Sequence, residues 1–279
     1  MSLKVNKPLV SVDWLYNNLD NEKLIILDCT IPKVTLSNSI LEDKLQIKNA
    51  IFFDIKNSFS DNNSEFPNTV LSPDEFQEKA QALGINNNSI IVCYDALEIY
   101  SSPRVWWMFQ LMGFNNIAVL DGGLPEWKKR NYYVEKPSNI SIKKGNFTVN
   151  YQPQKIKYTK DVLNSLENKD VLIVDARSKG RFLGTEPEPR KDLESGHMPN
   201  AVSLPFEEIQ QNGKMKSEAE LAKIFENYKN KKEIIFTCGS GITASILALG
   251  AAIIKQENVA VYDGSWTEWA STENLPISK

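Results

Sequence analysis

Short apolar runs alternate with helical patterns along most of the chain. Leu24–Cys29, Ile90–Tyr94 and Ile117–Leu120 are continuous apolar stretches of strand length. Between them, Ser72–Leu83 has a proline in its first turn followed by acidic residues, and Pro103–Met112 is followed by a glycine; these are signals of helix starts and ends. Strands that alternate with helices predict a mainly parallel sheet with helices on both faces.

The second half of the chain repeats this order of elements. Its apolar runs are Val171–Ala176, Ile234–Thr237 and Val259–Tyr262, and its helical patterns are Ser217–Tyr228 and Ala244–Lys255. Corresponding segments are about 142–151 residues apart, which is a domain-sized spacing rather than the roughly 20–50 residues of a solenoid repeat. The pattern therefore predicts two related α/β domains.

One pair of segments makes the repeat specific. Asp121–Trp127 and Asp263–Trp269 share an aspartate, a glycine turn and a tryptophan in the same register. Between the halves, Glu135–Tyr158 is polar and contains two prolines and a glycine, which is typical of a linker. We therefore predict three parts of the chain: an N-terminal domain at 1–136, a linker at 137–157 and a C-terminal domain at 158–279.

The most informative segment connects the predicted strand Ile234–Thr237 to the predicted helix at Ala244. Cys238 follows the strand directly, and the loop after it is Gly239-Ser240-Gly241-Ile242-Thr243. The glycines allow the backbone to curl so that successive N–H groups point inward, and the helix N-terminus adds unpaired donors. We expect a cysteine at the rim of such a ring to have a depressed pKa, and the amides from Gly239 to Ala244 to stabilise an anionic persulfide on it.

Two other interpretations of this segment stay open. Most isolated cysteines are buried core thiols, and Cys238 could be one of them. Cys-dependent phosphatases use a similar loop, but they need an arginine where this chain has Ala244, because its planar fork binds phosphate. The sequence therefore disfavours phosphatase and arsenate reductase activity.

Composition narrows the function further. The 279 residues carry a formal net charge of −3 without basic runs, which argues against nucleic acid and anionic membranes as partners. Three cysteines without a closely spaced pair, and the single histidine His197, disfavour a disulfide framework and a multi-histidine metal centre. We therefore expect a cytoplasmic protein that uses no cofactor and no metal.

Several longer segments match motifs of one known family. They are Asp175–Arg177, Gly180–Arg190, Ser195–Ala201, Tyr100–Met108, Leu120–Gly123 and the loop Cys238–Ala244. Together they resemble the 3-mercaptopyruvate and thiosulfate sulfurtransferases, which are tandem rhodanese-domain proteins. The resemblance extends over almost the whole chain. It implies two rhodanese-like α/β domains, with the active site in the second domain, facing the interdomain cleft.

The resemblance also implies roles for individual residues. Cys238 would take sulfur from 3-mercaptopyruvate as a persulfide, release pyruvate, and pass the sulfur to cyanide or to a thiol, including that of a thioredoxin-like protein. Arg181 and Arg190 would bind the carboxylate and keto oxygen of the donor, for which the planar guanidinium is suited. Ser240 would relay a proton or, equally, only satisfy local backbone groups. Asp95 stands at the position of Cys238, so the first domain is expected to be catalytically silent.

The loop favours one sulfur donor over another. Thiosulfate-specific relatives typically have Arg-Lys after the cysteine, whereas this chain has Gly239-Ser240, and a neutral loop suits a monoanionic α-keto acid better than a dianion. Two alternatives remain. One is a thiosulfate:cyanide sulfurtransferase, and the other is a persulfide relay module that serves a protein partner.

The remaining candidate residues are expected to be structural. They are Cys29, Cys93, Arg177 and His197. One departure from the family concerns a proposed proton relay, because some members have a histidine where this chain has Gln46. A glutamine cannot shuttle a proton at neutral pH, so a relay at this position would be lost.

Overall fold

The computed structural model describes residues 4–32, 45–138 and 141–279. The chain forms two compact units. Unit 1 consists of Met1–Ser60, Leu71–Tyr151 and Asn212–Lys214, and unit 2 consists of Asp61–Val70, Gln152–Gln211 and Met215–Lys279. The segment Asp61–Val70 is thus part of unit 2, although the chain on both sides of it belongs to unit 1.

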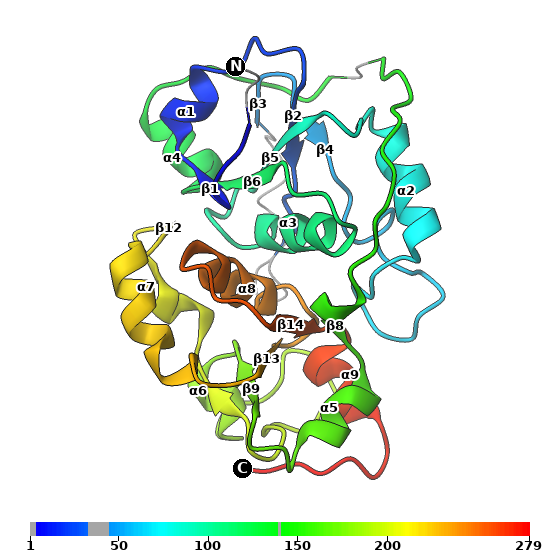
Figure 1. The fold of residues 1–279 in the computed structure, drawn as a ribbon, viewed down its shortest axis with the longest axis vertical. Coiled ribbons are helices and arrows are strands. Elements are labelled where there is room, and N and C mark those ends of the chain that lie inside the picture. The colour runs from blue at the N-terminus through cyan, green and yellow to red at the C-terminus, as the bar shows by residue number, and fades with distance from the viewer. Residues whose placement is uncertain (1–3, 33–44, 139–140) are drawn as a thin grey trace. The chain divides into compact units, whose positions relative to one another are not determined.

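Unit 1 is built on a five-stranded sheet (Figure 1). In spatial order its strands are β1 (Leu9–Val10), β6 (Ile117–Leu120), β5 (Ile90–Tyr94), β2 (Leu24–Asp28) and β4 (Ile51–Phe52). All neighbouring strands pair in parallel. Strands β5 and β6 are buried at every position, which explains their continuous apolar sequences.

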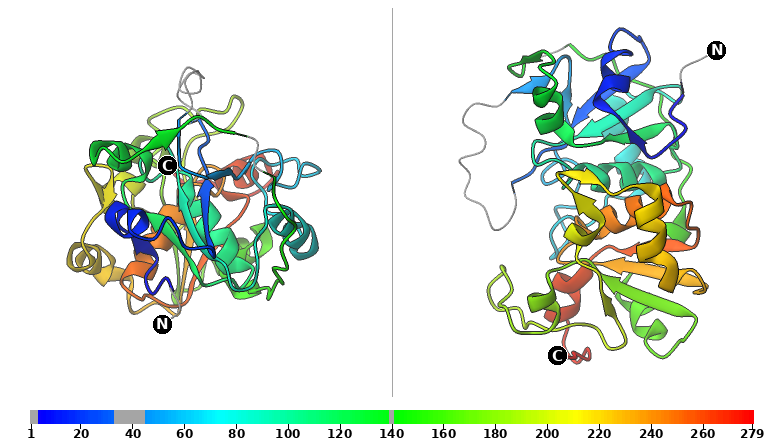
Figure 2. Two further views of the ribbon diagram at one scale, coloured as in Figure 1. Left: turned by 90° about the horizontal axis from the view of Figure 1, so that it is seen from above. Right: turned by 90° about the vertical axis from the view of Figure 1, so that its left-hand side faces the viewer.

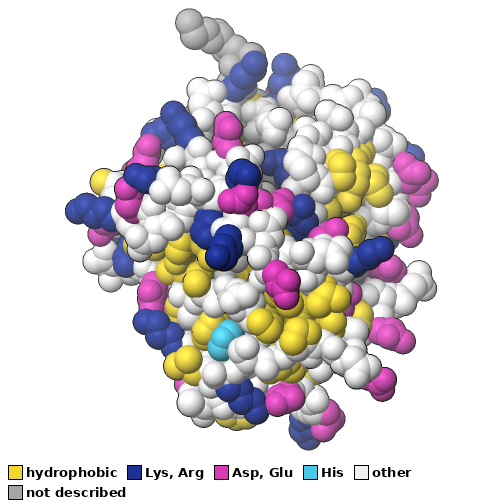
Figure 3. Space-filling model, turned by 60° about the horizontal axis from the view of Figure 1, so that its bottom comes forward, with side chains coloured by type: hydrophobic (Ala, Val, Ile, Leu, Met, Phe, Trp, Pro, Cys, Tyr) yellow, Lys and Arg dark blue, Asp and Glu magenta, His cyan; other side chains and the backbone are white. Residues whose placement is uncertain are grey.

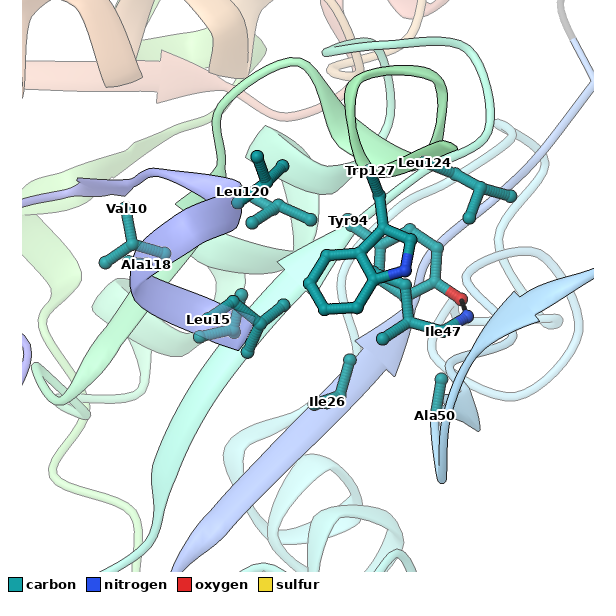
Figure 4. Packing of buried hydrophobic residues seen from close by; sticks show 12 residues of the cluster. Val10, Leu15, Ile26, Ile47, Ala50, Tyr94, Ala118, Leu120, Leu124 and Trp127 are labelled. Atoms are coloured by element: carbon teal, nitrogen blue, oxygen red, sulfur yellow. Dashed lines mark hydrogen bonds between the residues drawn. The ribbon is translucent and has the colours of Figure 1, made fainter. Parts of the chain in front are cut away.

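One face of this sheet is covered by α1 (Val12–Tyr16) and α4 (Gly123–Lys129). Figure 4 shows Leu15 of α1 and Trp127 of α4 packed with strand residues such as Tyr94, and all three are completely buried. The tryptophan that marks the sequence repeat is therefore a core residue.

The other face of the sheet is covered by α2 (Pro73–Ala82) and α3 (Ser102–Leu111). Phe76 of α2 and Phe109 of α3 meet edge to face, with 5.1 Å between ring centroids. The proline and the acidic first turn of α2 are as the sequence predicted, and the structure adds a capping box between Ser72 and Glu75.

Unit 2 repeats this architecture. Its five parallel strands are, in spatial order, β10 (Val202–Ser203), β9 (Val171–Asp175), β13 (Glu233–Thr237), β14 (Val259–Tyr262) and β8 (Ile156–Lys157). Strand β13 occupies the centre, as β5 does in unit 1. The predicted fold class of two related α/β domains with mainly parallel sheets is confirmed.

Helices also cover both faces of the unit 2 sheet, as Figure 2 shows. One face carries α5 (Thr159–Ser165) and α9 (Ser265–Ser271), whose Trp266 and Trp269 are completely buried. The other carries α7 (Glu218–Phe225) and α8 (Ala244–Ile253). A short helix, α6 (Lys179–Phe182), follows β9.

Two helices of unit 2 end earlier than the sequence predicted. Helix α8 ends at Ile253 because Lys255 has a φ of 58°, which is incompatible with a right-handed helix. Helix α7 ends at Phe225 and continues as the 3₁₀ turn Glu226–Tyr228. The remaining short elements are β3 (Gln46–Ile47), β7 (Val134–Glu135), β11 (Gln210–Gln211), β12 (Lys214–Met215) and the 3₁₀ turns Pro153–Lys155 and Phe206–Ile209.

The described residues include no helix that is long and apolar enough to cross a membrane. Within the same residues, no three His, Cys, Asp or Glu side chains are grouped so that they could hold a metal ion. On the face drawn in Figure 3, basic and acidic side chains are interspersed rather than gathered by sign.

Candidate active site

Cys238 lies at the carboxyl end of β13, directly before the loop that leads into α8. The first turn of α9 holds this loop. The carbonyl of Cys238 accepts a hydrogen bond from the N–H of Trp266 at 2.9 Å, and the carbonyl of Gly239 accepts one from the N–H of Thr267 at 3.0 Å. The carbonyls at the start of the loop are therefore satisfied by α9, while those of Gly241, Ile242 and Thr243 accept from residues of α8.

The side chain of Ser265 joins the loop to the neighbouring strand. Its oxygen accepts from the N–H groups of Cys238 at 3.3 Å and Gly241 at 3.1 Å, and its hydroxyl donates to the carbonyl of Tyr262 at 2.8 Å. Gly241 has a φ of 79°, a left-handed conformation that glycine adopts without steric cost. This turn is what the glycine in the sequence provides.

The other backbone N–H groups of the loop are available as donors. Among the described residues, no acceptor is bound to the N–H groups of Gly239, Ser240, Ile242, Thr243 and Ala244. Backbone N–H groups in folded proteins are nearly always paired, so five open ones before a helix N-terminus are suited to an anionic ligand.

Unit 1 holds an anion at the equivalent loop, and that anion is its own side chain. Asp95 follows β5 as Cys238 follows β13, and it is completely buried. Its carboxylate accepts from backbone N–H groups at 2.9–3.0 Å; the donors are Leu97, Tyr100, Ser101 and Ser102. Burial raises the pKa of the Asp95 carboxyl, and the hydrogen bonds from Ser102 and Tyr100 oppose that rise.

The two loops differ in whether a side chain of the protein binds their amides. In unit 1 the backbone N–H groups of the loop donate to the carboxylate of Asp95. In unit 2 the residue at that position is Cys238, and five backbone N–H groups of its loop have no acceptor among the described residues. An anion carried by the sulfur of Cys238, or by a ligand beside it, would take the place of the Asp95 carboxylate.

Two arginines lie over the loop. A Cβ atom on Gly239 would lie 3.2 Å from Nη2 of Arg181 and 3.6 Å from Nη1 of Arg190. Cys238 is 1% exposed, so it is more deeply buried than a residue at an open rim. The two guanidinium groups make the surroundings of the loop polar on this side.

Ser240 is the polar centre of the site. Its oxygen accepts from Nη2 of Arg190 at 3.2 Å and from Nδ2 of Asn68 at 2.9 Å. A hydroxyl that accepts two hydrogen bonds still has one proton to donate, and that proton must point away from both nitrogen donors. The hydroxyl is therefore oriented by its neighbours rather than by its own loop.

A buried ion network fixes Arg181. Its Nη2 and Nε donate to the carboxylate of Glu188, at 2.5 Å for the shortest contact. The same carboxylate accepts from Nη1 of Arg177 at 2.8 Å, and Arg177 also donates to Asp175 at 2.6 Å while its guanidinium stacks on Trp266. Burial disfavours the charged form of Arg177, but Asp175 and Glu188 more than offset it, so the pKa of Arg177 is raised.

Asn68 is a contact that the sequence did not reveal. It lies 172 residues from Ser240 in the chain, within the segment Asp61–Val70. The N–H of Val70 donates to Oδ2 of Asp263 at 2.9 Å and anchors the same segment in unit 2.

Gln46, at the position considered for a proton relay, donates to the carbonyl of Ala50 within unit 1.

The other two cysteines are packed in the core of unit 1. Cys29 and Cys93 are both completely buried, and Cys93 donates to the carbonyl of Ala118. Burial raises the pKa of Cys29, and the neighbouring Cys93 adds to the rise. A raised pKa keeps the Cys29 thiol protonated and unreactive at neutral pH.

The single histidine also has structural partners. Nδ1 of His197 lies 2.8 Å from the carbonyl oxygen of Phe182, and the two rings stack with 3.9 Å between centroids. The backbone of His197 pairs with that of Ser278 near the C-terminus. These contacts agree with the prediction that His197 is structural.

The chain is similar to known proteins over both units. The family of the rhodanese-like domain matches residues 11–130 and 158–272. Thiosulfate/3-mercaptopyruvate sulfurtransferase 2 of Arabidopsis thaliana is 38% identical over 300 residues, which covers 99% of this chain and 87% of that protein. The 3-mercaptopyruvate sulfurtransferase of Escherichia coli (strain K12) is 32% identical over 273 residues, which covers 96% of each. The crystal structure of SseA from Escherichia coli, a 3-mercaptopyruvate sulfotransferase, matches with a TM-score of 0.80 at 30% identity, covering 94% of this chain and 99% of that one.

Proposed function

The chain belongs to the 3-mercaptopyruvate and thiosulfate sulfurtransferases with two rhodanese-like domains, and from this premise we propose that it takes its sulfur from 3-mercaptopyruvate on Cys238. The observation that carries the proposal is the contrast between the two loops. In unit 1 the loop N–H groups donate to the Asp95 carboxylate, while the loop N–H groups beside Cys238 are open to an anionic ligand.

The proposed reaction has two steps. The Cys238 thiolate attacks the thiol sulfur of the donor, an S–S bond forms and the C–S bond breaks. The bonding electrons leave with the carbon as pyruvate enolate, and the thiol proton of the donor passes to the enolate carbon to give pyruvate. The persulfide that remains is anionic. A thiol or cyanide then attacks its outer sulfur and regenerates the Cys238 thiolate.

Each site residue has a role in this proposal. The open amides of the loop hold the persulfide anion; they belong to Gly239, Ser240, Ile242, Thr243 and Ala244, while Gly241 provides the turn. Arg181 and Arg190 lie over Gly239, where they bind the donor carboxylate and keto oxygen. Ser240 accepts from Asn68 and Arg190, which leaves its proton for the donor or for the leaving enolate.

The proposal assigns no sulfur transfer to unit 1. A carboxylate cannot carry sulfane sulfur, and Asp95 uses the loop amides itself. Cytoplasm is the compartment we propose, as expected for a chain whose three cysteines include no closely spaced pair. Cell fractionation tests this part separately, since one relative is named as mitochondrial.

The decisive experiment compares donors on the intact chain. We expect a larger kcat/KM with 3-mercaptopyruvate than with thiosulfate when cyanide or a small thiol is the acceptor. Mass spectrometry without an acceptor should show an adduct of about 32 Da, one sulfur atom, on Cys238. A larger kcat/KM with thiosulfate would contradict the donor assignment. Slow turnover with every small donor, together with fast sulfur transfer from a protein persulfide, would indicate a relay module instead.

A further inference from the structure

Glu188 brings a negative charge into direct contact with one of the arginines over the loop. Its side chain is 1% exposed, and both of its carboxylate oxygens accept from Arg181 at 2.5–3.2 Å. The guanidinium of Arg181 lies 3.2 Å from the place of a Cβ on Gly239. The Glu188 charge is therefore one side chain away from the loop beside Cys238.

The charges of this network nearly cancel. The network links Arg177, Arg181, Asp175 and Glu188, and Arg190 lies beside it over Gly239. Three guanidinium groups and two carboxylates leave a single positive charge among these five residues. Glu188 contacts Arg177 as well as Arg181, and Arg181 is the partner that lies beside the loop at Gly239.

We propose that Glu188 determines donor specificity by reducing the positive charge at Arg181, so that the site favours monoanionic donors over dianionic ones. This inference rests on the proposed function, since it requires the anionic end of the donor to meet Arg181. A dianion such as thiosulfate interacts with the Glu188 charge twice as strongly as the monoanion 3-mercaptopyruvate does at the same distance. The repulsion is weakly screened because the Glu188 side chain is buried.

Glu188 also fixes the direction of Arg181. Contacts to Nε and Nη2 hold one edge of the guanidinium, and Nη2 of this edge is also the atom 3.2 Å from the place of a Cβ on Gly239. A substitution at Glu188 therefore has two separable effects. Loss of orientation lowers kcat/KM for every donor, whereas loss of charge changes the ratio between donors.

The test is the variant Glu188→Gln, measured with 3-mercaptopyruvate and with thiosulfate. We expect the ratio of kcat/KM for thiosulfate to that for 3-mercaptopyruvate to rise about tenfold, whatever the absolute rates. The control is Glu186→Gln in the same loop, because Glu186 accepts from Ser178 rather than from Arg181; its ratio should equal that of the wild type. Glu188→Asp keeps the charge but shortens the side chain. It should lower kcat/KM for both donors and leave the ratio between them near the wild-type ratio.

Folding is checked by thermal unfolding of each variant. If Glu188→Gln does not fold, Glu188→Met removes the same charge with an apolar side chain of similar length, and the same rise is expected. An unchanged ratio in either folded variant would overturn the inference. Failure of the proposed function would look different. If the wild-type protein prefers thiosulfate, the donor assignment is wrong, but the predicted rise of the kcat/KM ratio in Glu188→Gln is unaffected. If turnover is too slow, the rates of persulfide adduct formation with the two donors give the same ratio.

Discussion

Two residues at equivalent positions, Cys238 and Asp95, divide the chemistry between the units. Each follows a central strand and precedes a loop of backbone amides. In the unit 1 loop the anion is the side chain of Asp95. In the unit 2 loop the proposed anion is a persulfide, which forms only when Cys238 reacts. The side chain at this one position therefore distinguishes a loop whose amides are bound by the protein's own carboxylate from a loop that precedes a cysteine.

At the same scale, replacing Cys238 tests the nucleophile directly. We expect Cys238→Ser to abolish the adduct of about 32 Da and all sulfur transfer, because a serine hydroxyl cannot form a persulfide. The free energy of unfolding of the variant should lie within about 1 kcal/mol of the wild-type value, since the two side chains are nearly the same size.

Cys29→Ala is the matched control for this experiment. Cys29 is equally buried, but burial and Cys93 raise its pKa, so the thiol is unreactive and its loss should leave the adduct intact. An adduct that persists in Cys238→Ser, or that disappears in Cys29→Ala, would contradict the assignment of the nucleophile.

At the scale of elements, the site depends on how α9 meets the loop between β13 and α8. The sequence predicted α8 and the glycine turn, because these follow from local patterns, whereas for α9 it indicated only the repeated segment Asp263–Trp269. The hydrogen bonds from the start of α9 could not be predicted, since they join residues 24–28 positions apart in sequence whose contact depends on the packing of the sheet. The Arg181–Glu188 pair was likewise missed, because charged residues in a loop give no periodic signal.

Ser265 is the residue through which α9 acts, and its equivalent in unit 1 is Gly123. Both have positive φ, 53° for Ser265 and 54° for Gly123. Ser265→Gly therefore removes the hydroxyl without straining the backbone. The N–H groups of Cys238 and Gly241 would lose their acceptor, and we expect a loss of about 1–2 kcal/mol in the free energy of unfolding.

The same variant should form the persulfide more slowly, because the loop amides would no longer be held in place. Denaturant unfolding and the rate of adduct formation measure the two effects. Ser165→Ala is the control, since its hydroxyl donates within α5 far from the loop in sequence. Wild-type rates of adduct formation in Ser265→Gly would show that α9 does not order the site.

At the scale of the whole molecule, the sequence repeat does not coincide with the contacts of the folded units. The repeat predicted two α/β domains and their order of elements, because each half carries the same hydrophobic pattern. It gave no sign that Asp61–Val70 belongs to unit 2, or that Asn68 reaches Ser240. That segment is polar and lacks a periodic pattern, and its partners are set only by the tertiary fold.

The segment Asp61–Val70 should therefore matter for activity more than for stability. We predict that Asn68→Gly lowers kcat/KM about tenfold with 3-mercaptopyruvate, because Ser240 loses one of the two donors that orient its hydroxyl. Glycine suits the φ of 63° at this position, so the backbone of the segment should be kept. Asn63→Gly, at an exposed position of the same segment, is the control and should keep wild-type activity.

The Asn68→Gly variant also tests whether the segment Asp61–Val70 acts by orienting the Ser240 hydroxyl or only by being attached to unit 2. The bond from Val70 to Asp263 remains in the variant, so the segment stays anchored while the Ser240 contact is lost. If Ser240 acts through its oriented proton, Ser240→Ala should lower kcat/KM at least as much as Asn68→Gly, and combining the two should add little. Full additivity of the two losses would show that Asn68 acts on the reaction by a route independent of Ser240.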